Sequence, residues 1–369
     1  PHPYPFPTAS GGKGIGQRIR SLPMTTEPIL IWGAGAIGGT LGAYWARAGI
    51  PVLLVDIVPE HVEACRTTGL SITGPIDTFT QVIPAVTPAE LTGTYKRIVL
   101  AVKAGATDEA VAALEPHLAP DGYVLSAQNG LNEIAIAAVV GAERTMGCFV
   151  NFGADWHGPG EILYGNEGAV VVGEIDGQIT PRAIEMHKLL LGFEPKSILT
   201  TNIWGYLWGK LSYGAMLFGT ALTQDSMSAN FADPDRLVVW LALGQEVAAV
   251  AAARGVKTLG FGEFDPMVFA PGQPEYPQIE TIAWLADYTS KTAKTHSGIW
   301  RDLAVRKRKT EVDPQIGIIA ALGREAGVPT PAVETLVTLI HDIEDGRRPQ
   351  SFETLKVLID RCKSVLTTA

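Results

Sequence analysis

The chain has 369 residues, a formal net charge of −9 and 46% hydrophobic residues. This length exceeds that of most single domains, so we expect two. Binding to nucleic-acid phosphates needs a basic face, so the negative charge argues against a nucleic-acid partner. The longest apolar run, residues 237–253, contains Gln245 and Glu246 and is typical of a buried helix. We therefore expect no membrane partner.

Two further features bear on the location of the protein. Cys65, Cys148 and Cys362 are far apart and odd in number, which favours a reducing cytoplasm over a disulfide framework. Residues 1–23 are rich in Pro and Gly and lack the apolar core of a signal peptide. We expect a disordered extension there, with Met24 beginning the folded protein.

The strongest motif is a set of glycines after a short apolar run. Residues 29–31 predict a buried strand, and a helix rich in small residues is expected over residues 36–48. Between them, Gly33, Gly35 and Gly38 have the G-x-G-x-x-G spacing. In a dinucleotide-binding unit the first glycine permits a tight turn, the second admits the pyrophosphate, and the third allows close helix–strand packing. The alternative is a glycine-rich turn in another kind of α/β domain.

The start of this helix and the next strand complete the cofactor prediction. Ala36 and Ile37 begin the expected helix, where backbone N–H groups can bind phosphate. The apolar run 52–55 ends in Asp56, whose carboxylate can accept hydrogen bonds from a ribose 2′-OH and repels a 2′-phosphate. The sequence therefore predicts NAD as the preferred cofactor and leaves NADP open. Asp56 can also cap the following helix.

The remaining elements predict an α/β fold with two domains: a doubly wound Rossmann sheet over residues 24–198 and a mostly α-helical domain over residues 199–369. In the first domain we expect helices at 59–67, 108–118, 131–140 and 181–191, strands at 97–102, 123–127, 144–152 and 161–173, and a strand hairpin at 71–86. In the second we expect helices at 203–222, 233–254, 279–294, 313–326, 331–345 and 352–366, with a long aromatic loop at 259–278 that is typical of a lid or an interface.

Two polar residues follow apolar strands of the first domain. Ligands of an open parallel sheet bind outside the carboxyl ends of its strands, so Lys103 and Asn129 are candidate cofactor and substrate contacts. The alternative for Lys103 is a solvated strand end. For Asn129 it is a simple turn, which the Asn-Gly dipeptide favours by itself.

Lys210 lies among apolar residues of the expected helix 203–222. Burial lowers the pKa of a lysine and makes it a usable proton donor near neutral pH. Tyr213, Gly214 and Phe218 share its helical face and are candidate substrate contacts. The alternative is a lysine whose stem covers apolar surface while its ammonium group reaches water.

A polar segment at 297–313 supplies the other candidates. Glu311 precedes a helix and can bond a substrate hydroxyl or hold Lys210. Ser297 is a candidate to face the substrate. The basic run 306–309 is either a solvated surface or a means of attracting an anionic substrate. We identify no grouping with the spacing of metal ligands, so no metal site is predicted.

In combination these motifs resemble the ketopantoate reductase family. The resemblance covers about residues 29–366 and rests on GAGAIGG at 33–39, AVKA around Lys103, the Asn129-Gly130 turn, LWGKL around Lys210, the segment 297–313 and AGVPTP at 326–331. It implies NAD(P)H-dependent reduction of a 2-oxo acid in a cleft between the two domains. It also implies that Lys210 is the general acid, that Glu311 bonds the substrate hydroxyl, and that the protein is a homodimer.

Four departures from the family pattern concern substrate and cofactor. Asparagines usually stand where this chain has Gly214 and Phe218, a serine pair is reduced to Ser297, an arginine is replaced by Asp56, and the loop 259–278 looks longer. We therefore expect an NAD-linked enzyme for a 2-oxo or 2-hydroxy acid other than ketopantoate. Two alternatives stay open: a true 2-dehydropantoate 2-reductase of pantothenate biosynthesis, and a non-catalytic dinucleotide sensor.

Overall fold

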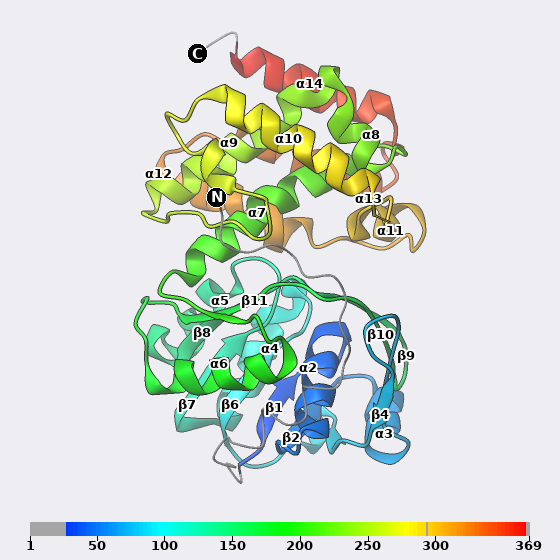
Figure 1. Ribbon diagram of the computed structural model, residues 1–369, viewed down its shortest axis with the longest axis vertical. Coiled ribbons are helices and arrows are strands. Elements are labelled where there is room, and N and C mark those ends of the chain that lie inside the picture. Colours follow the sequence, from blue (N-terminus) through cyan, green and yellow to red (C-terminus); the bar gives the residue numbers. More distant parts are fainter. Residues whose placement is uncertain (1–26, 293, 367–369) are drawn as a thin grey trace. The chain divides into compact units, whose positions relative to one another are not determined.

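The computed structural model describes residues 27–292 and 294–366 (Figure 1). The predicted extension at 1–23 lies outside the described residues. The chain divides into two compact units, Pro1–Ile203 and Trp204–Ala369. The predicted boundary between the two domains, after residue 198, lies a few residues before this division.

The first unit contains an eight-stranded sheet with the order β12-β11-β8-β7-β6-β1-β2-β5. The strands from β8 to β5 in this order are parallel, β11 is antiparallel to β8, and β12 is parallel to β11. Their bounds are β1 (Ile29–Trp32), β2 (Val52–Val55), β5 (Ala85–Val86), β6 (Tyr95–Leu100), β7 (Leu118–Ser126), β8 (Thr145–Val150), β11 (Val170–Glu174) and β12 (Ile198–Leu199). This arrangement confirms the predicted Rossmann sheet.

The residues of the central strand β1 show that both faces of this sheet are covered. Its residues are at most 4% exposed. Ile29 and Ile31 pack into one hydrophobic core, whereas Leu30 and Trp32 pack into another, as alternating strand residues must. The helices of this unit are α2 (Ala36–Arg47), α3 (Pro59–Thr67), α4 (Thr107–Leu114), α5 (Asn132–Val140) and α6 (Pro181–Phe193).

A second sheet, with the order β4-β3-β10-β9, was not anticipated. It consists of β3 (Leu70–Thr73), β4 (Phe79–Gln81), β9 (Gly153–Gly158) and β10 (Glu161–Asn166). The prediction of one strand over 161–173 is wrong, because β10 and β11 belong to different sheets. The chain comes very close to itself between them: a Cβ on Gly168 would lie 2.2 Å from the carbonyl oxygen of Asn151.

The second unit is helical, as predicted (Figure 1). Its helices are α7 (Ile203–Thr220), α8 (Met227–Ala232), α9 (Leu237–Ala253), α10 (Glu275–Ser290), α11 (Gly298–Ala304), α12 (Ile318–Ala326), α13 (Pro331–Glu344) and α14 (Phe352–Leu366). The short helices α8 and α11 were not predicted. The helix expected over 313–326 begins with a π-helical turn, Asp313–Gly317.

The stretch Pro234–Ala253 is the one described helix that is long and apolar enough to cross a membrane by length and composition alone. Half of its most apolar window is buried inside the protein. The helix α9 within it packs against α12, α13 and α14. These contacts explain why the stretch is so apolar: it is a helix of the protein core.

Candidate active site

The three motif glycines lie where β1 leads into α2: Gly33 and Gly35 precede the helix, and Gly38 is in its first turn. A Cβ would meet different surroundings at each position. Gly33 has φ of 98°, and a Cβ there would lie 2.8 Å from the backbone nitrogen of Val102. A Cβ on Gly38 would lie 2.1 Å from the carbonyl oxygen of Gly33. A Cβ on Gly35, by contrast, would meet no atom within 4 Å. The outer two glycines therefore serve the fold, and the space beside Gly35 is open to a ligand.

The first turn of α2 also has the features of a phosphate site. Gly35 is its N-cap residue and provides no side-chain cap, and the first turn contains no acidic residue. Gly35, Ala36 and Ile37 are partly exposed. The first N–H groups of a helix have no partner within the helix, and together with the helix dipole they attract an anion.

Asp56 lies directly after β2 and faces the glycine loop. Its Oδ2 accepts a hydrogen bond from the backbone N–H of Ala34 at 2.9 Å, and its Oδ1 accepts from the N–H of Val58 at 3.0 Å. No side chain caps α3, whose N-cap residue is Val58. Asp56 therefore holds the glycine loop and the turn before α3.

His61 is a residue of this region that the sequence analysis missed. It lies on α3, is 1% exposed, and its Nε2 is 2.8 Å from the carbonyl oxygen of Ala34. The spacing of α3 residues gives no sign of this contact, because the helix α2 and the strand β2 separate Ala34 from His61 in the chain.

Lys103 and Asn129 occupy neighbouring strand ends, as predicted. Leu100 of β6 is paired with Ser126 of β7, so the chain leaves both strands at the same level of the sheet. Lys103 and Asn129 are exposed there.

A buried amide joins the two loops that follow these strands. The side chain of Gln128, which is 4% exposed, donates to the carbonyl oxygen of Val102 at 3.0 Å and to Thr107 Oγ1 at 2.8 Å. Asn132 donates to the backbone oxygen of Asn129 at 2.7 Å. These bonds keep Lys103 and Asn129 on rigid loops.

On the helical unit, Lys210 lies on a partly exposed stripe of α7. Lys210, Tyr213, Gly214 and Leu217 are all partly exposed, whereas the residues between them are mostly buried. A Cβ on Gly214 would meet no atom within 4 Å, so the surface one turn after Lys210 is open. Phe218, in contrast, is 1% exposed. This burial does not support the predicted contact between Phe218 and a substrate.

The aromatic loop packs on α7 beside this stripe. The N–H of Leu259 donates to the carbonyl oxygen of Gly205 at 2.8 Å. The ring of Tyr213 lies 5.5 Å from that of Phe264 and 6.0 Å from that of Phe261. Tyr213 keeps some exposed surface, yet burial of its hydroxyl raises the pKa of the phenol above its usual value, so the group stays a neutral donor.

Glu311 is held by its neighbours at the start of the π-helical turn. The N–H and Oγ1 of Thr310 both donate to Glu344 Oε1 of α13 at 2.7 Å. The carbonyl oxygen of Glu311 accepts from the N–H of Gln315 at 3.1 Å. Single π-helical turns are frequent at functional sites. Ser297 caps α11 by accepting from the N–H of Trp300 at 3.1 Å and is 2% exposed, so its substrate contact stays a prediction.

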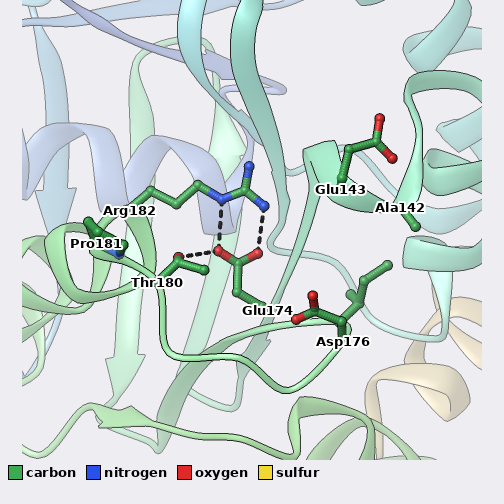
Figure 2. A pocket seen from close by; sticks show the side chains of 8 residues that line it. Ala142, Glu143, Glu174, Asp176, Thr180, Pro181 and Arg182 are labelled. Atoms are coloured by element: carbon green, nitrogen blue, oxygen red, sulfur yellow. Dashed lines mark hydrogen bonds and ion pairs between the residues drawn. The ribbon is translucent and has the colours of Figure 1, made fainter.

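A cavity of about 470 Å³ elsewhere in the first unit includes none of the predicted site residues (Figure 2). Its central carboxylate, Glu174, accepts two hydrogen bonds from Arg182 at 2.7 Å each and one from Thr180. These bonds tie the end of β11 to the start of α6. We assign this cluster a structural role.

Two sequence comparisons identify the relatives of this chain. Residues 29–177 match the family described as Ketopantoate reductase PanE/ApbA, and residues 202–344 match Ketopantoate reductase PanE/ApbA C terminal. The chain belongs to the ketopantoate reductase family. All the predicted site residues lie within the two matched regions. A 2-dehydropantoate 2-reductase of Mesorhizobium japonicum is 26% identical over 338 residues, which cover 85% of this chain and 96% of that protein.

Solved structures with this fold include several ketopantoate reductases. D-mandelate dehydrogenase, in a ternary structure with NADH and anilino(oxo)acetate, has a TM-score of 0.74 at 23% identity, covering 86% of this chain and 99% of that one. A ketopantoate reductase of Ralstonia eutropha JMP134 has a TM-score of 0.72 at 25% identity, covering 87% and 99%. A dimeric ketopantoate reductase of Staphylococcus aureus has a TM-score of 0.63 at 16% identity, covering 87% and 100%.

Proposed function

We propose that this ketopantoate reductase family member is an NAD-linked oxidoreductase. It transfers hydride between the nicotinamide and the keto or carbinol carbon of a small 2-oxo or 2-hydroxy acid. The observation that carries the proposal is the open space at Gly35, which lies on the uncapped first turn of α2. Gly35, Ala36 and Ile37 would bind the pyrophosphate, and Asp56 would bind the adenosine ribose.

Asp56 supports NADH over NADPH. Its Oδ2 and Oδ1 each accept one hydrogen bond from a backbone N–H group, of Ala34 and Val58 respectively. Each carboxylate oxygen can accept more than one hydrogen bond, so capacity remains for ribose hydroxyls. A 2′-phosphate beside this charge would be repelled. The D-mandelate dehydrogenase that shares the fold was solved with NADH, which agrees with this assignment.

Lys210 and Glu311 are the proposed catalytic residues. The bound cofactor supplies the hydride. Lys210 would donate a proton to the carbonyl oxygen as hydride reaches the carbon, and would accept that proton in the oxidising direction. Its charge would also stabilise the developing oxyanion. Glu311 would bond the substrate hydroxyl, while Lys103 and Asn129 would contact nicotinamide and substrate.

The open surface at Gly214 bears on the substrate. An asparagine is usual at this position in the family, and its replacement leaves space and removes an amide partner. We therefore propose an acid other than ketopantoate. The names of the curated relatives favour the second candidate, reduction of 2-dehydropantoate itself. We further propose a cytoplasmic homodimer, in line with the dimeric neighbour.

The deciding experiment follows absorbance at the reduced-nicotinamide band. Ketopantoate is offered with NADH and then with NADPH, followed by other 2-oxo acids with NADH and by 2-hydroxy acids with NAD. We expect little oxidation with ketopantoate and clear turnover with another acid and NAD(H). Fast oxidation of NADPH by ketopantoate would establish the second candidate instead. Tight binding of NADH without turnover of any acid would favour a dinucleotide sensor.

A further inference from the structure

The ring of His61 has a defined tautomer. Its Nδ1 lies 2.9 Å from the backbone nitrogen of Gly160 and 3.4 Å from Trp156 Nε1. Both of those groups can only donate, so Nδ1 accepts. The ring proton therefore resides on Nε2, which donates to the carbonyl oxygen of Ala34 at 2.8 Å.

This histidine joins three parts of the first unit. It belongs to α3, Ala34 belongs to the glycine loop, and Gly160 lies in the turn between β9 and β10 of the smaller sheet. Gly160 has φ of 74°, and a Cβ there would lie 2.8 Å from that of Ala64, so the turn is packed closely on α3. The second sheet thereby keeps the N–H of Gly160, the donor to Nδ1, in place.

Cys65 does not compete for the ring proton. Its Sγ lies 3.7 Å from His61 Nε2. Burial, together with the charge of Asp56, raises the pKa of the Cys65 thiol to about 12, so the sulfur remains a weakly accepting thiol. Both ring nitrogens of His61 are engaged and the side chain is 1% exposed, which excludes direct contact with a substrate.

The geometry of the peptide bond links His61 to the phosphate site. The carbonyl of Ala34 and the N–H of Gly35 belong to one planar trans peptide, in which C=O and N–H point in opposite directions. The bond from His61 draws the oxygen toward the protein interior. The Gly35 N–H is therefore directed away from His61. Asp56 fixes the preceding peptide by accepting from the N–H of Ala34.

We propose that His61 is a positioning residue for the dinucleotide: its Nε2–H orients the Ala34–Gly35 peptide so that the Gly35 N–H faces the pyrophosphate. The inference rests on the proposed function, because it assumes that the glycine loop binds NAD(H). Without this bond the peptide can rotate, and cofactor binding must then restore its orientation at a cost in affinity.

Two substitutions separate the donor of His61 from its acceptor. In His61→Gln, the side-chain amide reaches the position of Nε2 and can still donate to Ala34. In His61→Asn, the shorter amide reaches the position of Nδ1 and can accept from Gly160, but it leaves Ala34 without a donor. His187→Asn is the matched control, because His187 Nε2 makes a similar contact with the carbonyl oxygen of Ser197 at 2.8 Å, away from the glycine loop.

The measurements are the Kd for NADH by calorimetry and the Tm of each chain without cofactor. We expect His61→Asn to raise the Kd about tenfold, the effect of one hydrogen bond that orients the site. His61→Gln should stay within about threefold of wild type, and His187→Asn should lower only the Tm. Equal Kd values for the two His61 variants would overturn the inference, since a packing role would weaken both alike. A wild-type chain that binds neither NADH nor NADPH would overturn the proposed function as well.

The tautomer can be tested on the unaltered protein. Nitrogen-15 spectra of the imidazole rings distinguish a protonated Nε2 from a protonated Nδ1. We expect His61 to show the Nε2–H tautomer with and without NADH. A proton on Nδ1 would overturn the inference even where a variant fails to fold.

Discussion

Asp56 Oδ2 accepts the backbone N–H of Ala34 at 2.9 Å. This bond joins the acid at the end of β2 to the glycine loop after β1, so the residue expected to select the cofactor also shapes the loop that binds it. A substitution at Asp56 is therefore expected to change both specificity and affinity.

Replacing Asp56 with Asn should shift the cofactor preference. The amide keeps an oxygen acceptor but removes the charge that repels a 2′-phosphate. We expect the ratio of kcat/KM for NADH to that for NADPH to fall about tenfold, which corresponds to about 1.4 kcal/mol. Steady-state kinetics with both cofactors measure this ratio. Asp121→Asn is a suitable control, because Asp121 is exposed and pairs with Lys96. A wild-type preference for NADPH would contradict the assignment.

Two glycine substitutions should affect different properties: one the affinity for NADH, the other the stability of the fold. A Cβ on Gly35 meets open space, so Gly35→Ala should fold normally while weakening NADH binding at least tenfold. A Cβ on Gly38 would overlap the carbonyl oxygen of Gly33, so Gly38→Ala should lower the free energy of unfolding by about 1–3 kcal/mol. Urea denaturation and calorimetry measure these two quantities. Unchanged affinity in Gly35→Ala would show that the open space is not the pyrophosphate site.

Removal of the Lys210 ammonium group should slow the reaction strongly without weakening the binding of NADH. We expect Lys210→Ala to lower kcat by about 10²–10⁴, the usual contribution of a general acid. The Kd for NADH should remain within about twofold, because the glycine loop is on the other unit. Lys356→Ala serves as the control, since Lys356 is 56% exposed and pairs with Asp360. Turnover close to wild type in Lys210→Ala would refute the role of this lysine.

Gly214→Asn should test substrate choice without disturbing the fold. The new side chain enters open space one turn after Lys210 and restores the amide usual in the family. We expect a Tm within about 2 °C of wild type and an increase of roughly tenfold in kcat/KM for ketopantoate relative to the preferred acid. An unchanged ratio would mean that this position does not contact the substrate.

Glu133 should make stability depend on pH. It is 1% exposed, and burial raises the pKa of its carboxyl to about 8. Ser126 and the backbone N–H of Glu133 oppose this effect only in part, and neither carboxylate oxygen makes a hydrogen bond of normal geometry within the described residues. The folded state therefore binds the proton more tightly than the unfolded state, whose pKa is near 4.5.

It follows that the contribution of Glu133 to the free energy of unfolding is largest below about pH 4.5 and is lost as the pH rises toward about 8. Glu133→Gln resembles the protonated acid and lacks this dependence. Urea denaturation of both chains between pH 5 and pH 8 should show the wild type losing stability relative to the variant as the pH increases. Parallel curves over this range would mean that Glu133 is ionised in the folded protein.

The parts of the site that could be predicted are those set by local geometry. The G-x-G-x-x-G spacing of Gly33, Gly35 and Gly38 predicted a tight turn followed by close packing of a helix on a strand. Lys103 and Asn129 could be placed together because parallel strands expose their carboxyl ends at one edge of the sheet. The long helices from α7 to α14 followed from apolar periodicity, which depends on neighbours three and four residues away.

The sequence by itself therefore determined the Rossmann sheet, the helical unit and the residues of the glycine loop. Only the tertiary structure decided that β10 and β11 belong to different sheets, that Phe218 is buried while Gly214 borders open space, and that His61 holds Ala34. The contacts of His61 join residues 27 and 99 positions apart. Such contacts depend on the packing of separate elements, and no local pattern of residue types encodes them.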